Sequence, residues 1–209
     1  MLIALANPKG GVGKTTIAVQ LALLAHERGR SVAFVDCDAQ RTSSRWIKGL
    51  GDPFSLHRMT NVEELSRRMD SILDASEFVV ADGPAGYSPI TKALIVVSDL
   101  CLLPCGPSLA ELETIPEVIA LVREVQSNRS DRGPKACVVP NRVPAGARLS
   151  RDMPEALESL GLPHVDGLPQ RMAHQEALTQ RSAVWRLGRS GEEAAKEFFH
   201  LYEQIERQI

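Results

Sequence analysis

The sequence lacks a long hydrophobic run. Every apolar stretch in its 209 residues falls short of the ~20 residues that a membrane-spanning helix requires. The apolar residues 1–6 have no basic segment before them and lead into Asn7-Pro8-Lys9, which is typical of a first β-strand and not of a secretory signal. We therefore expect a cytoplasmic protein that does not associate with membranes.

Cysteine is also scarce, and its spacing excludes the common metal-binding patterns. The cysteines lie in or beside apolar runs, with no Cys-x-x-Cys pair and no histidine at zinc-finger spacing. We expect them to be buried thiols in a reducing compartment. The four are Cys37, Cys101, Cys105 and Cys137.

A strong net charge is missing as well. Lysine and arginine number 24 against 26 acidic residues, so the formal charge is −2 and bulk coating of nucleic acid is excluded. The balance is uneven, because residues 123–191 carry 11 basic against 7 acidic residues. A locally basic segment in a mildly acidic chain predicts a directed binding surface.

Short β-type runs alternate with helical patterns along the chain. The expected strands are continuous apolar runs, as is typical of parallel strands buried on both faces, and cover residues 2–6, 31–36, 78–82, 99–104, 136–140 and 164–168. The expected helices cover residues 14–28, 61–75, 115–127 and 149–160, with a last helix that a capping box starts at Ser190. The sequence predicts an α/β fold in one domain, 1–209: a mostly parallel, twisted β-sheet covered by helices on both faces.

The first strand leads into a glycine-rich loop that opens the first helix, Asn7-Pro8-Lys9-Gly10-Gly11-Val12-Gly13-Lys14-Thr15-Thr16. Glycines let successive backbone N–H groups converge on phosphate oxygens, and the helix N-terminus adds positive potential. We expect Lys14 to reach the β and γ phosphates of ATP and the Thr15 hydroxyl to ligate Mg²⁺. The usual G-x-x-x-x-G-K-[ST] pattern fails at its first position, Pro8, and the loop carries an additional lysine, Lys9.

This loop resembles the deviant P-loop (deviant Walker A motif) of the ParA/MinD ATPases. Val35-Asp36-Cys37-Asp38-Ala39-Gln40 is similar to their second motif, with Ala39 in place of the usual proline. Phe78-Val79-Val80-Ala81-Asp82-Gly83 is similar to their third motif, a strand that ends in an aspartate. The resemblance extends over essentially the whole chain and is greatest to the short plasmid-partition ParA proteins of the ParF type.

The resemblance implies a role for each polar residue of these motifs. Asp36 and Asp82 would hold the Mg²⁺ ion through bound water, and Asp38 would orient the water that attacks the γ phosphate. Lys9 would reach across an ATP-bound homodimer to the partner's nucleotide. The expected catalytic residues are therefore Lys9, Lys14 and Asp38.

The expected nucleotide-binding residues comprise the loop and a pair of residues for the base. In the family a pair such as Asn-Arg follows a later strand, and Asn141-Arg142 matches it in place. The segment Pro169-Gln170 could close the same pocket. The full set is Lys9, Gly10, Gly11, Val12, Gly13, Lys14, Thr15, Thr16, Asn141 and Arg142.

The function that we expect is partition of plasmid or chromosomal DNA by ATP-dependent dimerisation, non-specific DNA binding and hydrolysis that a ParB-like or cargo-adaptor protein stimulates. Phosphate contacts would come from arginines in the basic segment, because no aromatic residue interleaves them for base stacking. Single-domain length leaves no room for a separate DNA-reading domain. The arginines are Arg142, Arg148, Arg151, Arg171, Arg181, Arg186 and Arg189.

Four alternatives share the same P-loop. A ParA-like ATPase could position a protein cargo on the nucleoid, and the sequence does not separate this function from DNA partition. A metabolic P-loop ligase does not typically carry a lysine at the position of Lys9, and an iron-protein-like reductase needs a cysteine that Gly83-Pro84-Ala85-Gly86 lacks. A membrane oscillator of the MinD kind needs a cationic amphipathic tail, whereas residues 191–209 hold 5 acidic and 2 basic residues.

Overall fold

Seven parallel β-strands hydrogen-bond in the order β3-β2-β4-β1-β5-β6-β7. They were seen in a computed structural model that describes residues 1–131, 133–144, 148–159 and 161–208. The strands are β1 (Leu2–Leu5), β2 (Val32–Asp36), β3 (Ser55–Arg58), β4 (Phe78–Asp82), β5 (Leu100–Cys105), β6 (Lys135–Val143) and β7 (Leu168–Pro169). The predicted α/β fold with a parallel sheet is confirmed.

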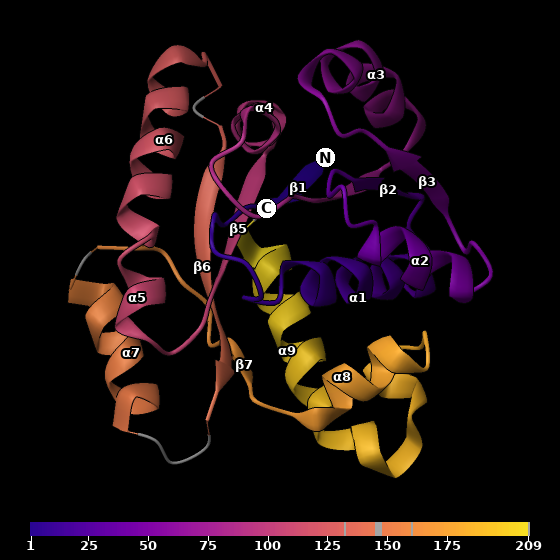
Figure 1. Cartoon of the computed structure of the whole chain (residues 1–209), viewed down its shortest axis with the longest axis vertical. Coiled ribbons are helices and arrows are strands. Elements are labelled where there is room, and N and C mark those ends of the chain that lie inside the picture. The colour runs from indigo at the N-terminus through magenta and orange to yellow at the C-terminus, as the bar shows by residue number, and fades with distance from the viewer. Residues whose placement is uncertain (132, 145–147, 160, 209) are drawn as a thin grey trace.

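Helices cover both faces of the sheet, as Figure 1 shows. The helices are α1 (Lys14–Glu27), α2 (Thr42–Gly49), α3 (Val62–Ala75), α4 (Pro89–Val97), α5 (Leu109–Leu112), α6 (Ile115–Asn128), α7 (Arg148–Ser159), α8 (Met172–Thr179) and α9 (Glu192–Gln208). Two turns of 3₁₀-helix, Val184–Arg186 and Gly188–Gly191, lie between α8 and α9. Among the described residues no helix combines the length and the apolar character that crossing a membrane requires.

The central strands supply side chains to two hydrophobic cores because successive residues of a strand point to opposite faces. On β1, Ile3 and Leu5 pack with α1, α2, α8 and α9. Leu2 and Ala4 pack with α3, α4, α6 and α7 on the other face. A strand that is buried on both faces has no polar position to spare, which explains the continuous apolar runs.

The sequence did not predict strand β3 or helices α2, α4, α5 and α8. Strand β3 lies at the edge of the sheet, where Leu56 and His57 are half-buried and Ser55 and Arg58 are exposed, so it lacks a continuous apolar run. Helices α2, α4, α5 and α8 are short, and α4 is apolar almost throughout. The strand expected over 164–168 is confined to Leu168–Pro169, and His164 forms only an isolated bridge to Val138.

The start of the last helix also differs from the expectation. Helix α9 begins at Glu192, after the 3₁₀-turn Gly188–Gly191. The Ser190 hydroxyl donates to the carbonyl of Leu187 within that turn. The predicted capping box is therefore replaced by a 3₁₀ entry into the helix. The four cysteines are buried free thiols, as expected.

The strand order places one crevice at the carboxyl edge of the sheet. Strands β2, β3 and β4 lie on one side of β1 in the sheet order, and β5, β6 and β7 lie on the other side, so the direction of winding reverses at β1. Ligands of open α/β sheets bind outside the carboxyl ends of the strands at such a reversal. Asp36 and Asp82 are register partners at the ends of β2 and β4, beside the loop that follows β1.

Candidate functional site

The loop between β1 and α1 adopts at two positions a backbone conformation that strongly favours glycine. Gly11 and Gly13 have φ angles of 75° and 99°, in the left-handed region. A Cβ atom at Gly13 would lie 2.0 Å from the side-chain nitrogen of Asn141, so close packing as well as backbone conformation requires glycine there. Asn141 in turn donates to the carbonyl of Val12 at 2.6 Å. The turn before α1 is thus fixed from β6 as well as from β1.

The first residues of the loop are anchored to neighbouring strands. Asn7 is fully buried, and its amide nitrogen donates to the carbonyl of Pro104 at 2.7 Å. Its side-chain oxygen accepts the N–H of Lys9 at 2.8 Å. The N–H of Gly86 donates to the carbonyl of Pro8 at 2.7 Å, which ties the loop to the segment after β4. The loop is held on both sides before any ligand binds.

Lys14 lies inside the loop that precedes it. Its ammonium donates to the carbonyls of Asn7 at 2.9 Å and of Lys9 at 3.0 Å, and the residue is only 7% exposed. Burial lowers the pKa of Lys14, and the negative charges of Asp82 and Asp38 oppose this shift. A buried cation held mainly by backbone carbonyls is positioned to exchange them for the stronger acceptors of a phosphate group.

The carboxyl group of Asp82 is half satisfied. One oxygen accepts the hydroxyl of Thr15 at 2.8 Å. The other is buried beside the hydroxyl of Ser43, although neither of these two atoms makes a hydrogen bond of ordinary geometry. Desolvation raises the pKa of Asp82 to about 7, and nearby Asp36 adds to this rise, whereas the hydroxyls of Thr15 and Ser43 and the positive charge of Lys14 act in the opposite direction. The oxygen beside Ser43 is therefore only weakly satisfied and can accept a stronger ligand.

These residues fit a magnesium ion. Mg²⁺ prefers hard oxygen ligands, keeps several waters and is held through one or two carboxylates together with the phosphates of a substrate. The Thr15 hydroxyl and the weakly satisfied oxygen of Asp82 supply such ligands. Within the described ranges no three His, Cys, Asp or Glu side chains are grouped to hold a metal by themselves. The donor set therefore suits an ion that arrives with a nucleotide.

Asp36 is the last residue of β2, and Asp38 lies in the segment that connects β2 to α2. One oxygen of Asp36 accepts the N–H of Asp38 at 3.0 Å, and the other accepts both the N–H, at 3.0 Å, and the hydroxyl of Ser44. The carboxylate of Asp38 accepts the N–H of Gln40 at 2.9 Å. Asp36 is fully buried, whereas Asp38 is partly exposed at the rim of the crevice. Asp36 thus fixes the loop that presents Asp38.

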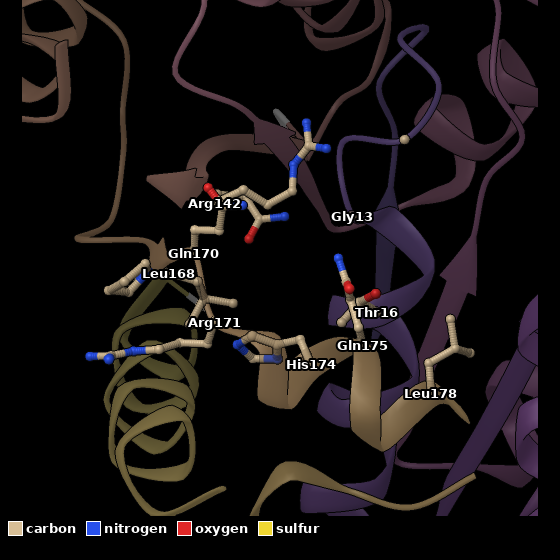
Figure 2. Close-up of a pocket in the computed structure, with 12 residues that line it drawn as sticks. Gly13, Thr16, Arg142, Leu168, Gln170, Arg171, His174, Gln175 and Leu178 are labelled. Atoms are coloured by element: carbon tan, nitrogen blue, oxygen red, sulfur yellow. The ribbon is translucent and has the colours of Figure 1, made fainter. Parts of the chain in front are cut away.

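A pocket of about 260 Å³ adjoins the P-loop on the side of β6, β7 and α8. Figure 2 shows Gly13 and Thr16 on one side of it, with Arg142, Leu168 and Gln170 across from them and His174 and Gln175 on α8. Arg142 has a left-handed backbone (φ 56°), and its guanidinium pairs with Glu111 at 3.1 Å. The lining residues are Gly11, Gly13, Thr16, Asn141, Arg142, Leu168, Pro169, Gln170, Arg171, His174, Gln175 and Leu178.

The structure brings nearly all of the predicted site residues to one edge of the sheet. Asn141 and Arg142 line the pocket, although the Asn141 amide is engaged with the loop itself. Lys9 stands at the surface, with its backbone bonded to Asn7 and Lys14. The residues at this edge are Lys9, Gly10, Gly11, Val12, Gly13, Lys14, Thr15, Thr16, Asp36, Asp38 and Asp82.

Other residues of the site were not found from the sequence. Ser44 and Glu111 hold Asp36 and Arg142, and both lie in short helices without a motif. Gln20 and His174 are joined by a hydrogen bond across 154 positions of the chain. The sequence predicts Asn7 only as part of the loop, and no motif indicates that its side chain is buried and bonded to Pro104. Rules based on residue spacing cannot predict contacts between segments that are far apart in the sequence.

An arrangement of this kind belongs to the P-loop class of nucleotide-binding proteins. Comparison with known families agrees: residues 3–184 match the CobQ/CobB/MinD/ParA nucleotide binding domain, and the chain belongs to that family. The resemblance seen in the sequence motifs is confirmed.

Individual relatives cover almost the whole chain. The maintenance of carboxysome distribution protein A of Halothiobacillus neapolitanus is 28% identical over 97% of this chain and 95% of its own. A plasmid partition protein of Borrelia burgdorferi bound to AMPPNP has a TM-score of 0.77 at 16% identity, covering 100% of this chain and 99% of its own. Cobyrinic acid a,c-diamide synthase of Mycobacterium smegmatis, with an ATP analogue and magnesium, has a TM-score of 0.69 at 20% identity, covering 90% and 97%. These structures share the fold, and nucleotide and Mg²⁺ are bound within the family.

The raised pKa of Asp82 predicts how the stability of the metal-free protein depends on pH. The folded state keeps a proton on Asp82 up to about pH 7, whereas the unfolded chain loses it near the ordinary value of 3.8. The folded state binds more protons in this window, so the free energy of unfolding falls as pH rises through it. Asp82→Asn removes this titration, and we expect it to stabilise the metal-free protein at pH 8 by up to ~4 kcal/mol.

Urea denaturation in the presence of EDTA, at pH 5 and pH 8, measures this difference. Asp74→Asn, at an exposed position of α3, is the matched control and should follow the wild type at both pH values. If Asp82→Asn and the wild type keep the same stability difference at pH 5 and pH 8, Asp82 does not titrate in this range.

Proposed function

We propose that the chain is a ParA-type ATPase that binds Mg²⁺-ATP, dimerises around it, and uses hydrolysis to position a cargo. The observation that carries the proposal is the position of two lysines in one loop, one buried and one exposed. Lys14 lies inside the loop, where a phosphate would be, and Lys9 faces outward from the same loop. The buried lysine is sufficient to explain nucleotide binding. The exposed lysine therefore suggests a second role, which we propose is contact with the nucleotide of a partner in the dimer.

The residues of the loop provide the binding energy and the positioning for phosphoryl transfer. On nucleotide binding the Lys14 ammonium would exchange the carbonyls of Asn7 and Lys9 for phosphate oxygens, while the loop N–H groups and the start of α1 add donors. Thr15, with Asp82 and Asp36 through water, would hold the Mg²⁺ ion, which neutralises developing charge on the phosphates. Transfer to water then needs only an oriented nucleophile.

Asp38 is the candidate for orienting that water. Its carboxylate stands at the rim of the crevice, close enough to Lys14 for its charge to act on the ammonium. One of its oxygens accepts the N–H of Gln40, which limits the movement of the side chain. The carboxylate of Asp36 accepts the backbone N–H of Asp38 and so fixes the backbone at that position. A held but accessible carboxylate is suited to accepting a hydrogen bond from an attacking water.

The cargo is either DNA or a protein assembly, and both readings rest on the same ATPase cycle. The relatives include a protein for carboxysome distribution and one for plasmid partition. We propose that a ParB-like or cargo-adaptor protein stimulates hydrolysis, and that the ATP-bound dimer binds DNA non-specifically. Residues 191–209 carry 5 acidic against 2 basic residues, which disfavours an anionic membrane as the surface that is bound.

Ion pairs reduce the charge that the arginines of the basic segment offer to DNA. Arg181 and Arg189 are exposed, and the side chains of Arg148 and Arg151 lie outside the described residues. DNA binding by one protomer would therefore be weak, and a two-fold dimer would double the available surface. The pairs are Arg142–Glu111, Arg171–Glu197 and Arg186–Glu27.

Substitution of the two lysines separates nucleotide binding from dimerisation. We expect Lys14→Ala to abolish tight ATP binding, because the buried cation that faces the phosphates is lost. We expect Lys9→Ala to bind ATP and remain monomeric, because its exposed side chain acts across the dimer. Fluorescence binding of ATP and light scattering with and without Mg²⁺-ATP measure the two properties. A Lys9→Ala variant that dimerises on ATP like the wild type contradicts the cross-dimer role.

Replacement of Asp38 should slow hydrolysis without loss of binding. We expect Asp38→Ala to bind ATP and dimerise, with a turnover rate on the order of 10²-fold lower because the attacking water loses its orientation. Phosphate release in single-turnover experiments measures the rate. Gln40→Ala, which keeps the carboxylate, should retain most of the activity. Hydrolysis by Asp38→Ala at the wild-type rate removes Asp38 from the mechanism.

DNA binding should depend on ATP, ignore sequence and fall steeply with salt. Each phosphate contact contributes about −0.9 to the slope of log affinity against log salt. Arg189→Glu should weaken binding to unrelated duplexes without changing ATP affinity, whereas Arg67→Glu, on α3, should have little effect. Equal affinity with ATP, ADP and no nucleotide contradicts the dimer switch. Absence of DNA binding in every state favours the metabolic ligase.

A further inference from the structure

A buried hydrogen-bond chain joins α1, α8 and the segment after α8. Gln20 of α1 is fully buried, and its side-chain oxygen accepts the N–H of Val184 at 3.2 Å. Its side-chain nitrogen lies 3.1 Å from Nδ1 of His174. A backbone N–H can only donate, so the amide oxygen of Gln20 is fixed toward Val184. The NH₂ group, which has no lone pair to offer, therefore faces the histidine.

This chain sets the tautomer of His174. Because the Gln20 NH₂ group donates, Nδ1 of His174 must accept and carries no proton. The proton of the neutral ring is consequently on Nε2. Burial lowers the pKa of His174, the charge of Arg171 lowers it further, and Glu197 opposes both, so the neutral ring is favoured at neutral pH.

The Nε2 atom of His174 has no partner within the protein although it is buried. The ring lines the pocket beside the P-loop, together with Thr16, Asn141 and Gln170 (Figure 2). Leu168, Pro169 and Leu178 give other parts of this pocket an apolar lining suited to a flat ring. The cavity also carries polar side chains such as Thr16, Gln170 and Gln175, but the hydrogen bond from Gln20 fixes the direction of the His174 donor. A donor of fixed direction can read one acceptor on a ligand.

We propose that His174 contacts the purine base of the bound nucleotide, with Nε2–H donating to one ring nitrogen of the base, and that Gln20 is the positioning residue that fixes this donor. The inference rests on the proposed function, in which the P-loop binds the phosphates of ATP. With the phosphates at Gly13 and Lys14, the adjoining pocket is the cavity that the base can reach. Neither residue belongs to a motif of the sequence.

The test compares ATP with three analogues in which N1, N3 or N7 of the purine is replaced by C–H, in the presence of Mg²⁺. Equilibrium fluorescence titration with the wild type should show that one analogue binds about tenfold more weakly than ATP, the loss of one hydrogen bond. His174→Phe, which keeps a ring and removes the donor, should lose a similar factor for ATP. In the His174→Phe variant the same analogue should bind as well as ATP, because the substitution and the analogue remove the same hydrogen bond.

Two further variants separate a contact with the base from a structural role. His174→Gln, which can place an amide donor at a similar reach, should recover part of the affinity for ATP. Thr179→Ala, on α8 and away from the pocket lining, should bind ATP and all three analogues like the wild type. A loss that is equal for ATP and the analogues in His174→Phe, with no recovery in His174→Gln, overturns the contact with the base.

The tautomer is measured directly on the wild type. Long-range ¹H–¹⁵N spectra of the imidazole should show His174 protonated on Nε2 and unprotonated on Nδ1 at pH 7.5, and the Nε2 signal should shift when Mg²⁺-ATP is added. Protonation on Nδ1 overturns the role of Gln20. If the wild type does not bind Mg²⁺-ATP at all, the proposed function fails; if it binds ATP and the three analogues with equal affinity, only the reading of the base by His174 fails.

Discussion

The two hydrogen bonds from the Lys14 ammonium to the carbonyls of Asn7 and Lys9 hold the ammonium inside the P-loop of the ligand-free protein. They place a buried cation where phosphate oxygens, which are stronger acceptors than carbonyls, would replace them. The same bonds keep a buried cation satisfied, which an isolated ammonium could not be. The bonds to Asn7, Pro8 and Val12 from the side of the sheet keep the loop in place around Lys14.

The carboxyl edge of the sheet adds the acidic half of the site. Parallel strands β2 and β4 end in register at Asp36 and Asp82, so two carboxyl groups lie beside one loop. Their environments differ: Asp36 is fully engaged with α2 and the backbone of Asp38, whereas one oxygen of Asp82 has only the hydroxyl of Ser43 beside it. In the proposed cycle both would hold the Mg²⁺ ion through water, and Asp36 also supports the loop that carries Asp38. One topology thus gives two similar residues different surroundings.

The motifs could be predicted from the sequence because they are local. The glycines, Lys14 and Thr15 lie within one loop, and Asp36 and Asp82 each end an apolar strand, so spacing and strand patterns suffice. The Gln20–His174 hydrogen bond and the Arg142–Glu111 pair join segments that only the tertiary fold brings together. Edge strand β3 and short helix α8 have weak periodicity because few of their side chains face the core. The Arg142–Glu111, Arg171–Glu197 and Arg186–Glu27 pairs could not be foreseen from charge counts alone.

The central claim is that this loop and this pair of aspartates bind ATP together with Mg²⁺. Isothermal titration calorimetry of the wild-type chain with ATP, in matched buffers that contain either Mg²⁺ or EDTA, tests it most directly. The account predicts saturable binding of one ATP per chain in Mg²⁺ and clearly weaker binding in EDTA, because Thr15 and Asp82 then act without the ion. Absence of saturable binding in Mg²⁺, or equal affinity in both buffers, would contradict it.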